Sequence, residues 1–535
     1  MKVGYLPAFR ATAAVLAVAV VAIRLLPFAF DDAYIHFRIA ENLATHGVPY
    51  FNTAEPVLAT SSPVWTCALA PLALLPVSLP TLVALLNSVL SVLGAVLWSS
   101  VLQRVVGRRI PGACRWLFGL VYVGILLPSS AGLMETPLAV LLLGWASLLL
   151  IDGRPCAWLV LAVAIFTRYE LVVFASLAAA VQLVTARTRL LRRALMFMLP
   201  VGVLSVLLIV FFATPIPQAI TAKQVVYSLS RERVFHDALF MLVPRLDEPI
   251  LGLRLGLPSW VWVPFVCFFA GAVWHSLPLS SIAADRRQRW GLCIGASGVL
   301  VAGAYVLKHV FLHEWYAPLF CVPLVFVAFA VAHTSKLARV LAVALSVLPV
   351  VTVAEHSLAA MGCTRVLRIG QPGARVQRYM EVGTLLDEIF PGARLMAAEI
   401  GGLGYSFRGT ILDGVGLITP AAVKYHPLRG SEAGIGGVPS GLVRELEPEL
   451  IVSYPVFLLD VQSSSAAEKY VRLKLPAFAE KYRGRLAADH VWGCRTLSIF
   501  VRRDIADDER IGILTSRLGA TLDSSPNASP AVTRS

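Results

Sequence analysis

Long apolar runs recur along this chain, and they constrain its fold more than any other feature. They occupy residues 11–30, 66–79, 81–103, 116–128, 136–151, 156–185, 194–213, 259–277, 291–307, 317–334 and 337–353. Charged residues make up 15% of the 535 residues, whereas soluble proteins carry roughly 25%. Because an open sheet cannot satisfy its backbone in lipid, the sequence predicts a polytopic α-helical membrane protein with about 11 transmembrane segments.

The formal net charge of +14 is concentrated in short basic stretches between apolar runs. This is the pattern of the positive-inside rule, so it predicts no nucleic-acid partner. The basic stretches at 285–290 and 333–339 then belong to the cytoplasmic side, and everything after about 354 to the outer side. The front half leaves two alternatives open. Either one short segment is re-entrant, or 156–185 is a pair of half-helices broken near Arg168.

The composition changes after residue 353, where apolar runs shorten and charged residues, glycine and proline increase. Residues 394–400, 409–413 and 449–453 have the pattern of short strands, and 381–390 that of a helix. We expect an extracytoplasmic α/β domain over 354–520 and a disordered tail over 521–535.

Two adjacent carboxylates, Asp31 and Asp32, follow the first apolar run directly. Ionisable groups at a membrane border are costly unless they face water, a partner or a substrate. They open an external loop, 29–65, in which Tyr34, Phe37, Arg38 and Glu41 share one face of an expected amphipathic interfacial helix. A tandem pair followed by such a loop favours a functional site over a solvated helix end.

The string DDAYIHFRIAENLATHGVPYFNTAEPVLATSSPVW, residues 31–65, resembles the first loop of GT-C-fold glycosyltransferases. It is most similar to the loop of bacterial arabinofuranosyltransferases that use polyprenyl-phosphate-linked arabinofuranose. Shorter resemblances follow in the family's order at 132–137, 166–170, 214–223 and 401–417. The sequence departs from the family pattern at Ala54, Tyr169 and Gln218, where glycine, proline and asparagine are usual.

The resemblance implies that 1–353 is a GT-C-like catalytic domain that moves a sugar, arabinofuranose above others, from a polyprenyl-phosphate donor to a glycan or protein acceptor. It places the enzyme in the bacterial cytoplasmic membrane with its active site on the outer face. Asp31 or Asp32 would be the base that takes the acceptor proton. The implied cations for the donor phosphate are Arg38, Arg168 and Lys223. The implied sugar or acceptor groups are Glu55 and Glu135. Further candidates for that role are His36, Trp65, Gln218, His313, Glu314 and Tyr316, and His313 with Glu314 could also bind a metal.

Several of these residues also have structural interpretations. Lys223 could reach from a helix end to the headgroups, and Arg168 could form an ion pair with Glu170 inside the bundle. Glu135 could cap the helix that begins beside it. Residues 313–316 could anchor the chain at the interface. No cofactor is expected with certainty, and a divalent metal at the aspartate pair is left open.

A transporter or flippase of a lipid-linked sugar is the main alternative function. Such proteins bind their substrate near the bilayer midplane, often between repeated halves. This sequence shows no convincing internal repeat, and its polar loops concentrate on one side. A lipid-phosphate phosphatase or ligase ranks lower, because clustered His and Arg residues are missing.

Overall fold

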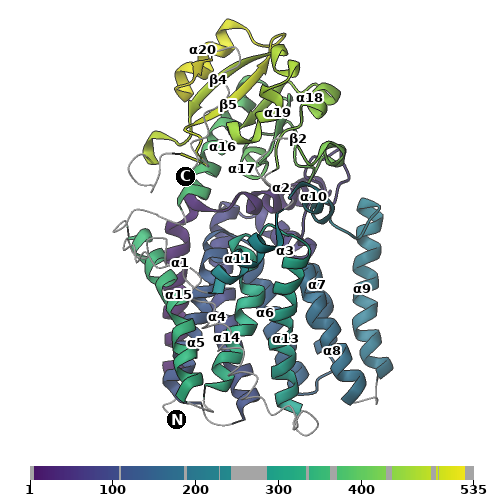
Figure 1. Cartoon of the computed structure of the whole chain (residues 1–535), viewed down its shortest axis with the longest axis vertical. Helices are drawn as coiled ribbons and strands as arrows, with labels where there is room; N and C mark the ends of the chain where they lie inside the picture. The colour runs from purple at the N-terminus through teal and green to yellow at the C-terminus, as the bar shows by residue number, and fades with distance from the viewer. Residues whose placement is uncertain are drawn as a thin grey trace.

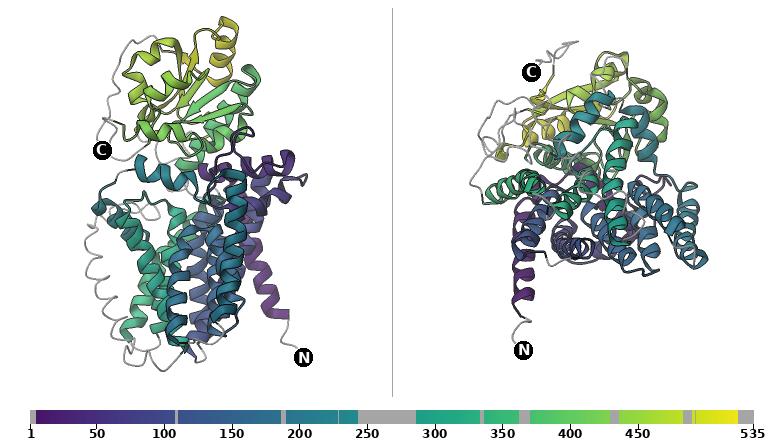
Figure 2. Two further views of the ribbon diagram at one scale, coloured as in Figure 1. Left: turned by 90° about the vertical axis from the view of Figure 1, so that its right-hand side faces the viewer. Right: turned by 60° about the horizontal axis from the view of Figure 1, so that its bottom comes forward.

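The computed structural model of the chain describes residues 5–107, 110–185, 190–227, 229–242, 286–332, 336–361, 370–428, 436–482, 490–491 and 493–523. The described chain is mostly helical and has two parts stacked end to end (Figure 1). A bundle of long apolar helices forms one part. The second part is a C-terminal α/β region, residues 370–523, and Figure 2 shows the same stacking from two other directions.

The first part contains the helices that precede the C-terminal α/β region. They are α1 (Tyr5–Arg24), α2 (Asp31–His46), α3 (Pro63–Ala73), α4 (Leu79–Val106), α5 (Gly112–Ala131), α6 (Thr136–Ile151), α7 (Ala157–Thr167), α8 (Val172–Thr185), α9 (Leu190–Phe212), α10 (Gln218–Val226), α11 (Arg231–Leu242), α13 (Arg286–Leu307), α14 (Pro318–Val331) and α15 (Lys336–Ala360). Short 3-10 turns lie among them at Leu26–Phe28, Tyr169–Leu171 and Glu314–Tyr316.

Four helices in the described ranges, within α4, α5, α9 and α13, are long and apolar enough to cross a membrane. Shorter apolar helices accompany them in α1, α3, α6, α7, α8 and α14. Leu199, Val206 and Val210 of α9 expose much of their surface, as expected for side chains that face lipid,. The apolar run at 259–277 lies outside the described residues, so the total of eleven spans stays a prediction.

Helices α4 and α6 run in the same direction. Asn87, near the start of α4, donates to the carbonyl of Met134 at 2.9 Å, beside the start of α6. At the other end, Arg104 of α4 pairs with Asp152, which follows α6. Helix α1 begins at this same end of the bundle, away from the C-terminal α/β region (Figure 1). Arg104, near the end of α4, therefore shares an end of the bundle with the start of the N-terminal helix, as the charge rule requires,.

Helix α3 explains how the front half satisfies that rule. Its Thr66 contacts His36 of α2 at 3.2 Å, so α3 begins at the α2 end of the bundle, where α4 also begins. With 11 residues, α3 is about 16 Å long, against about 30 Å for the hydrocarbon core. This geometry agrees with the first of the two alternatives drawn from the sequence, a short re-entrant segment, and the number of crossings stays a prediction.

The apolar run at 156–185 is also interrupted, as its polar centre indicates. Helix α7 ends at Thr167, Arg168 is extended, and a 3-10 turn leads into α8. Arg168 lies against Glu135 at the start of α6, so α6 and α7 are antiparallel. The break places a charged side chain at the α2 end of the bundle.

The C-terminal α/β region contains one six-stranded sheet in the order β2-β1-β3-β5-β4-β6. Strand β1 pairs in parallel with β2 and β3, and the other pairings are antiparallel. The strands are β1 (Arg394–Ala397), β2 (Thr410–Asp413), β3 (Leu450–Ser453), β4 (Tyr470–Pro476), β5 (Thr496–Arg502) and β6 (Thr521–Leu522). The helices are α16 (Gly370–Ile389), α17 (Gly401–Ser406), α18 (Ser440–Leu446), α19 (Leu459–Gln462) and α20 (Asp508–Leu518). Short 3-10 turns occur at Pro420–Tyr425, Pro455–Phe457, Ser465–Lys469 and Glu480–Tyr482.

Strands β1, β2 and β3 and helix α16 overlap the segments whose patterns predicted strands and a helix. The apolar core of this region extends beyond residues 370–523. It also includes Ile35 and Ile39 of α2 and Ala219, Ala222 and Val226 of α10. Helices α2 and α10 thus lie between the bundle and the C-terminal α/β region.

Candidate functional site

The two aspartates at the start of α2 point to different partners. The carboxylate of Asp31 accepts hydrogen bonds from the backbone N–H groups of Gly401, at 2.9 Å, and Gly402, at 2.8 Å. These glycines open α17 in the C-terminal α/β region. The carboxylate of Asp32 lies 3.6 Å from the ammonium of Lys223 on α10. The two aspartates therefore differ in role: Asp31 joins the bundle to the C-terminal α/β region, and Asp32 forms an ion pair with a lysine.

The surroundings of Asp32 keep its carboxylate ionised. Burial alone would raise its pKa, but the positive charge of Lys223 lowers the pKa below the usual value. The pKa of Lys223 is raised despite burial, because Tyr316 and Asp32 stabilise its positive charge. Its ammonium also donates to the Tyr316 hydroxyl at 3.3 Å. Lys223 thus connects Asp32 on α2 with the segment before α14.

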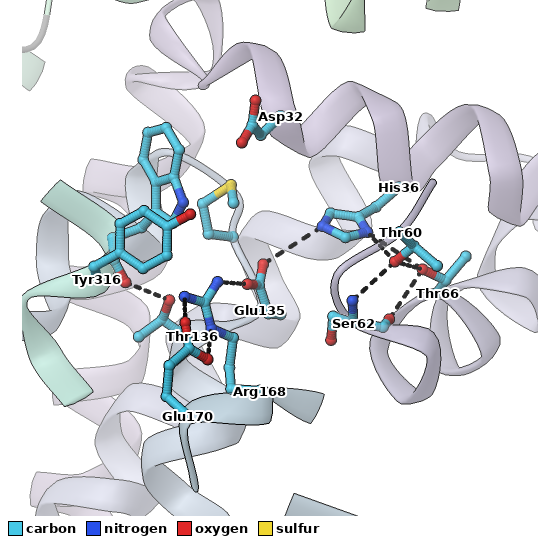
Figure 3. A network of polar contacts seen from close by, with 12 residues as sticks. Asp32, His36, Thr60, Ser62, Thr66, Glu135, Thr136, Arg168, Glu170 and Tyr316 are labelled. Atoms are coloured by element: carbon cyan, nitrogen blue, oxygen red, sulfur yellow. Dashed lines mark hydrogen bonds and ion pairs between the residues drawn. The ribbon is translucent and has the colours of Figure 1, made fainter. Parts of the chain in front are cut away.

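His36 lies one turn after Asp32 and faces into the bundle (Figure 3). Its Nδ1 contacts the hydroxyls of Thr60, at 3.0 Å, and Thr66, at 3.2 Å, and its Nε2 lies 3.6 Å from the carboxylate of Glu135. Burial lowers the pKa of His36, which favours a neutral ring. The two threonines fix the orientation of that ring beneath Asp32.

Glu135 and Arg168 form a buried ion pair below His36 (Figure 3). Glu135 is fully buried, and its Oε1 accepts from Arg168 at 2.5 Å. Arg168 also donates two hydrogen bonds to Glu170, at 3.1 and 2.7 Å, and its guanidinium lies 4.6 Å from the centre of the Tyr316 ring. The hydroxyl of Tyr305 donates to Glu170 at 2.9 Å. The expected Arg168–Glu170 pair therefore exists, while the Glu135 side chain makes no capping bond to α6.

Aromatic rings from the segment before α14 border the same group. His313 stacks on Trp315, with 4.2 Å between ring centres and 3° between ring planes. The ring centre of Phe311 lies 4.6 Å from that of His313. Burial, helped by the charge of Lys223, lowers the pKa of His313 to about 3, so its ring is neutral. Glu314 has an exposed side chain.

Arg38 is placed away from this group. It is buried on α2, where it donates to the carbonyl oxygens of Phe51 at 2.8 Å, Phe407 at 2.7 Å and Gly409 at 2.9 Å, and to that of Gly404. A guanidinium has five N–H donors, and here they serve these four backbone oxygens and the side-chain oxygen of Asn52 at 3.5 Å. Arg38 holds the C-terminal α/β region onto α2 in this arrangement, so we drop it from the phosphate-binding set.

Three further residues named from the sequence have other surroundings. Glu55 accepts from Asn52 at 2.8 Å within its own loop. Gln218 donates to the carbonyl of Gly416 at 3.2 Å. Trp65 is fully buried in the helical core, and its indole N–H has no hydrogen-bond partner in the described part of the chain.

The structure also brings in residues that the sequence did not single out. Thr60 and Thr66 orient His36, and their place beside the Ser-Ser-Pro step was the available signal. Tyr305 sits in an apolar run with no distinguishing pattern. Arg375 and Glu399 of the C-terminal α/β region form an ion pair of 2.7 Å. Burial, opposed by Arg375, raises the pKa of Glu399 to about 7. Their position beside α2 depends on the fold and has no sequence signal.

Metal binding at the aspartate pair remains a prediction. Among the residues that the structure describes, no group of three or more His, Cys, Asp or Glu side chains is placed to hold an ion. The ammonium of Lys223 lies 3.6 Å from the carboxylate of Asp32.

The fold is similar to that of a solved membrane protein with a GT-C-like architecture. The particular structure is ArnT from Cupriavidus metallidurans bound to undecaprenyl phosphate, with a TM-score of 0.50, 14% identity, and coverage of 95% of this chain and 100% of that one. The apo state of the same ArnT matches with a TM-score of 0.46, 13% identity, and coverage of 94% and 99%. No protein-family model and no curated protein matches the sequence. The likeness supports the GT-C-like fold expected from the sequence.

Proposed function

We propose that this chain is a membrane glycosyltransferase that transfers a sugar from a polyprenyl-phosphate donor to a hydroxyl group of an acceptor. The observation that carries the proposal is the Asp32–Lys223 pair, a carboxylate and a cation 3.6 Å apart at one end of an apolar bundle. The similar ArnT structure is bound to undecaprenyl phosphate, which supports a lipid phosphate as the donor's anchor.

Asp32 is the proposed general base. Its side chain keeps 31% of its surface exposed, so an acceptor hydroxyl can reach it. The carboxylate takes the hydroxyl proton as the acceptor oxygen forms a bond to the anomeric carbon. The bond from that carbon to the phosphate oxygen breaks, and the lipid phosphate leaves with the electron pair.

Lys223 is the proposed cation for the leaving phosphate. Positioned cations stabilise the negative charge that develops on a departing phosphate, and the Lys223 ammonium is partly exposed beside Asp32. Arg168 is a weaker candidate, because Glu135 and Glu170 already neutralise its buried guanidinium. Its proposed role is to hold Glu135, whose Oε2 has no hydrogen-bond partner among the residues that the structure describes and lies 3.6 Å from His36 Nε2.

This arrangement couples donor binding to the strength of the base. Lys223 lowers the pKa of Asp32 in the free protein. A bound phosphate attracts the same ammonium, so the pKa of Asp32 rises when the donor is in place. Asp32 therefore becomes a stronger base only in the complex that can react.

The proposal also covers the sugar, the acceptor and the side of the membrane on which transfer occurs. The sequence motifs favour arabinofuranose and a glycan or protein acceptor. Arg104, near the end of α4, lies at the other end of the bundle from the site, which favours an extracytoplasmic site in a bacterial cytoplasmic membrane.

A transfer assay tests the proposal. The purified protein in detergent receives a radiolabelled polyprenyl-phosphate arabinofuranose and a glycan acceptor, and both acceptor label and released lipid phosphate are measured. We expect both products from the wild type and from Asp508→Asn, a control at an exposed carboxylate of α20. Labelling without the lipid donor would contradict the donor assignment. Movement of the intact donor across a vesicle membrane without release of lipid phosphate would favour the flippase alternative.

A further inference from the structure

We propose that the C-terminal α/β region positions the reacting pair, because it holds both α2, which carries Asp32, and α10, which carries Lys223. Asp31 and Gln218 are then positioning residues. The inference deepens the proposed function, and its kinetic consequence rests on it. Figure 1 shows α2 and α10 between the bundle and the C-terminal α/β region.

Helix α2 is held at its beginning by α17. The two backbone N–H groups of Gly401 and Gly402 bind the carboxylate of Asp31, the residue next to Asp32. The fit at this contact is close, since a Cβ atom added to Gly401 would collide with the backbone carbonyl of Asp31. A displacement of α17 therefore also displaces the backbone of Asp31 and, with it, that of Asp32.

The same helix is held again two turns later. Arg38 binds carbonyl oxygens at the end of α17 and in the turn before β2, including those of Phe407 at 2.7 Å and Gly409 at 2.9 Å. Glu41 accepts from the Tyr405 hydroxyl at 2.6 Å. Three successive contacts on one helix fix its rotation as well as its height above the bundle.

Helix α10 is held by the loop that follows β2. Gln218, its first residue, donates to the carbonyl of Gly416 at 3.2 Å. Ala219, Ala222 and Val226 are buried in the apolar core of the C-terminal α/β region. Their i, i+3, i+7 spacing makes one face of α10, and Lys223 lies on the adjoining face toward Asp32.

The two segments that contact α2 and α10, helix α17 and the loop after β2, follow two adjacent, paired strands of the sheet. Residues 401–406 form α17, which follows β1, and Gly416 lies in the loop after β2; β1 and β2 pair in parallel over four residues. Asp413, at the end of β2, accepts backbone N–H bonds from Val415 and Ile418 and so fixes that loop. The Asp32–Lys223 distance is thus set from outside the bundle by adjacent strands of the sheet.

Hydrogen–deuterium exchange of the full-length protein tests this coupling without reference to activity. The variant is Gly401→Ala, which disturbs the α17–α2 contact, and the matched control is Gly512→Ala on α20, where an added Cβ meets no atom within 4 Å. We expect Gly401→Ala to raise amide exchange by about tenfold in α2 and also in α10, which Gly401 does not touch. Unchanged exchange in α10, with exchange in α2 increased, would overturn the proposal.

A second variant approaches the coupling from α10 and avoids the close contact. Gln218→Ala removes the bond to Gly416 and leaves Lys223 in place. With transfer as the readout, we expect it to lower kcat severalfold, to change KM for the donor little, and to move the acid limb of the pH profile upward, because Lys223 then shields Asp32 less. Unchanged kcat and pH profile with increased α10 exchange would overturn the positioning role. A wild type without transfer activity would contradict the proposed function, and the exchange result alone would then decide on the coupling.

Discussion

Asp32 and Lys223 share one electrostatic environment, and this determines how activity should depend on pH. Asp32 must be ionised to accept a proton, so its pKa sets the acid limb. That pKa lies below the usual range in the free protein, where the charge of Lys223 outweighs the effect of burial. We predict that the acid limb of kcat lies at higher pH than that of kcat/KM, because the donor phosphate draws Lys223 away. Initial rates over a pH series give both limbs, and coincident limbs would contradict the coupling of donor and base.

Arg38 gives a second prediction at the same scale. Its guanidinium binds several backbone carbonyls at once, and the ammonium of a lysine cannot reproduce that planar fork. Arg38→Lys should therefore lower the free energy of unfolding by about 1.5–3 kcal/mol. The affinity for a polyprenyl phosphate should stay near that of the wild type. Thermal unfolding in detergent and a lipid-binding titration separate the two effects. Lost lipid affinity at unchanged stability would restore Arg38 as a phosphate ligand.

The residue chemistry was partly predictable from the sequence. Asp32, His36, Glu135, Arg168, Lys223, His313 and Tyr316 come from separate motifs and gather in one place. The division of the aspartates was not predictable, since the partner of Asp31 lies 370 residues away in the sequence. Arg38 fits the phosphate-binding pattern equally well, and its carbonyl partners, which the sequence does not reveal, favour a structural role instead.

At the scale of elements, the pairing of α6 with α7 depends on buried charges. Glu135 and Arg168 are at most 3% exposed, and Glu170 supplies the second carboxylate. Removing one partner of such a pair leaves an uncompensated charge, at about 3–5 kcal/mol. We predict that Arg168→Gln lowers the unfolding free energy by that amount and that adding Glu135→Gln recovers part of it. A double variant no more stable than Arg168→Gln, measured by thermal unfolding in detergent, would contradict this role.

The elements themselves follow local signals to different degrees. The break at Arg168 was visible as polar residues within an apolar run, and α2 as an amphipathic pattern after the aspartates. The behaviour of α3 was only one of two alternatives, because an apolar segment of its length fits either a crossing or a re-entrant path. Two contacts distinguish the paths: that of Thr66 with His36 near the start of α3, and that of Asn87 with Met134 near the start of α4, which put both starts at the same end of the bundle.

At the scale of the whole molecule, the stacking of the two parts predicts a topology. The basic residues Arg104 and Arg287 lie near one another at the end of the bundle away from α2, since Arg287 approaches Gly107. The positive-inside rule places this end in the cytoplasm. Alkaline phosphatase fused after residue 107 should be inactive and fused after residue 523 active. An inactive fusion at residue 523 would place the C-terminal α/β region away from an extracytoplasmic acceptor.

The relation between the two parts was the least predictable feature. Apolar runs and a change in composition separate them along the chain, and this pattern is typical of an appended binding domain. The apolar core that continues onto α2 and α10 joins residues from distant segments. Such contacts leave no local signal, because alanine or isoleucine on a helix fits many neighbours equally well.

The central claim is that Asp32 is the base of a lipid-phosphate sugar transfer and that Asp31 is not. The most direct measurement is the single-turnover transfer rate of Asp32→Asn and Asp31→Asn, together with their binding of a polyprenyl phosphate. We predict that Asp32→Asn loses about 10²- to 10⁴-fold in rate, keeps lipid binding, and falls well below Asp31→Asn. Transfer by Asp32→Asn at the wild-type rate would contradict the account.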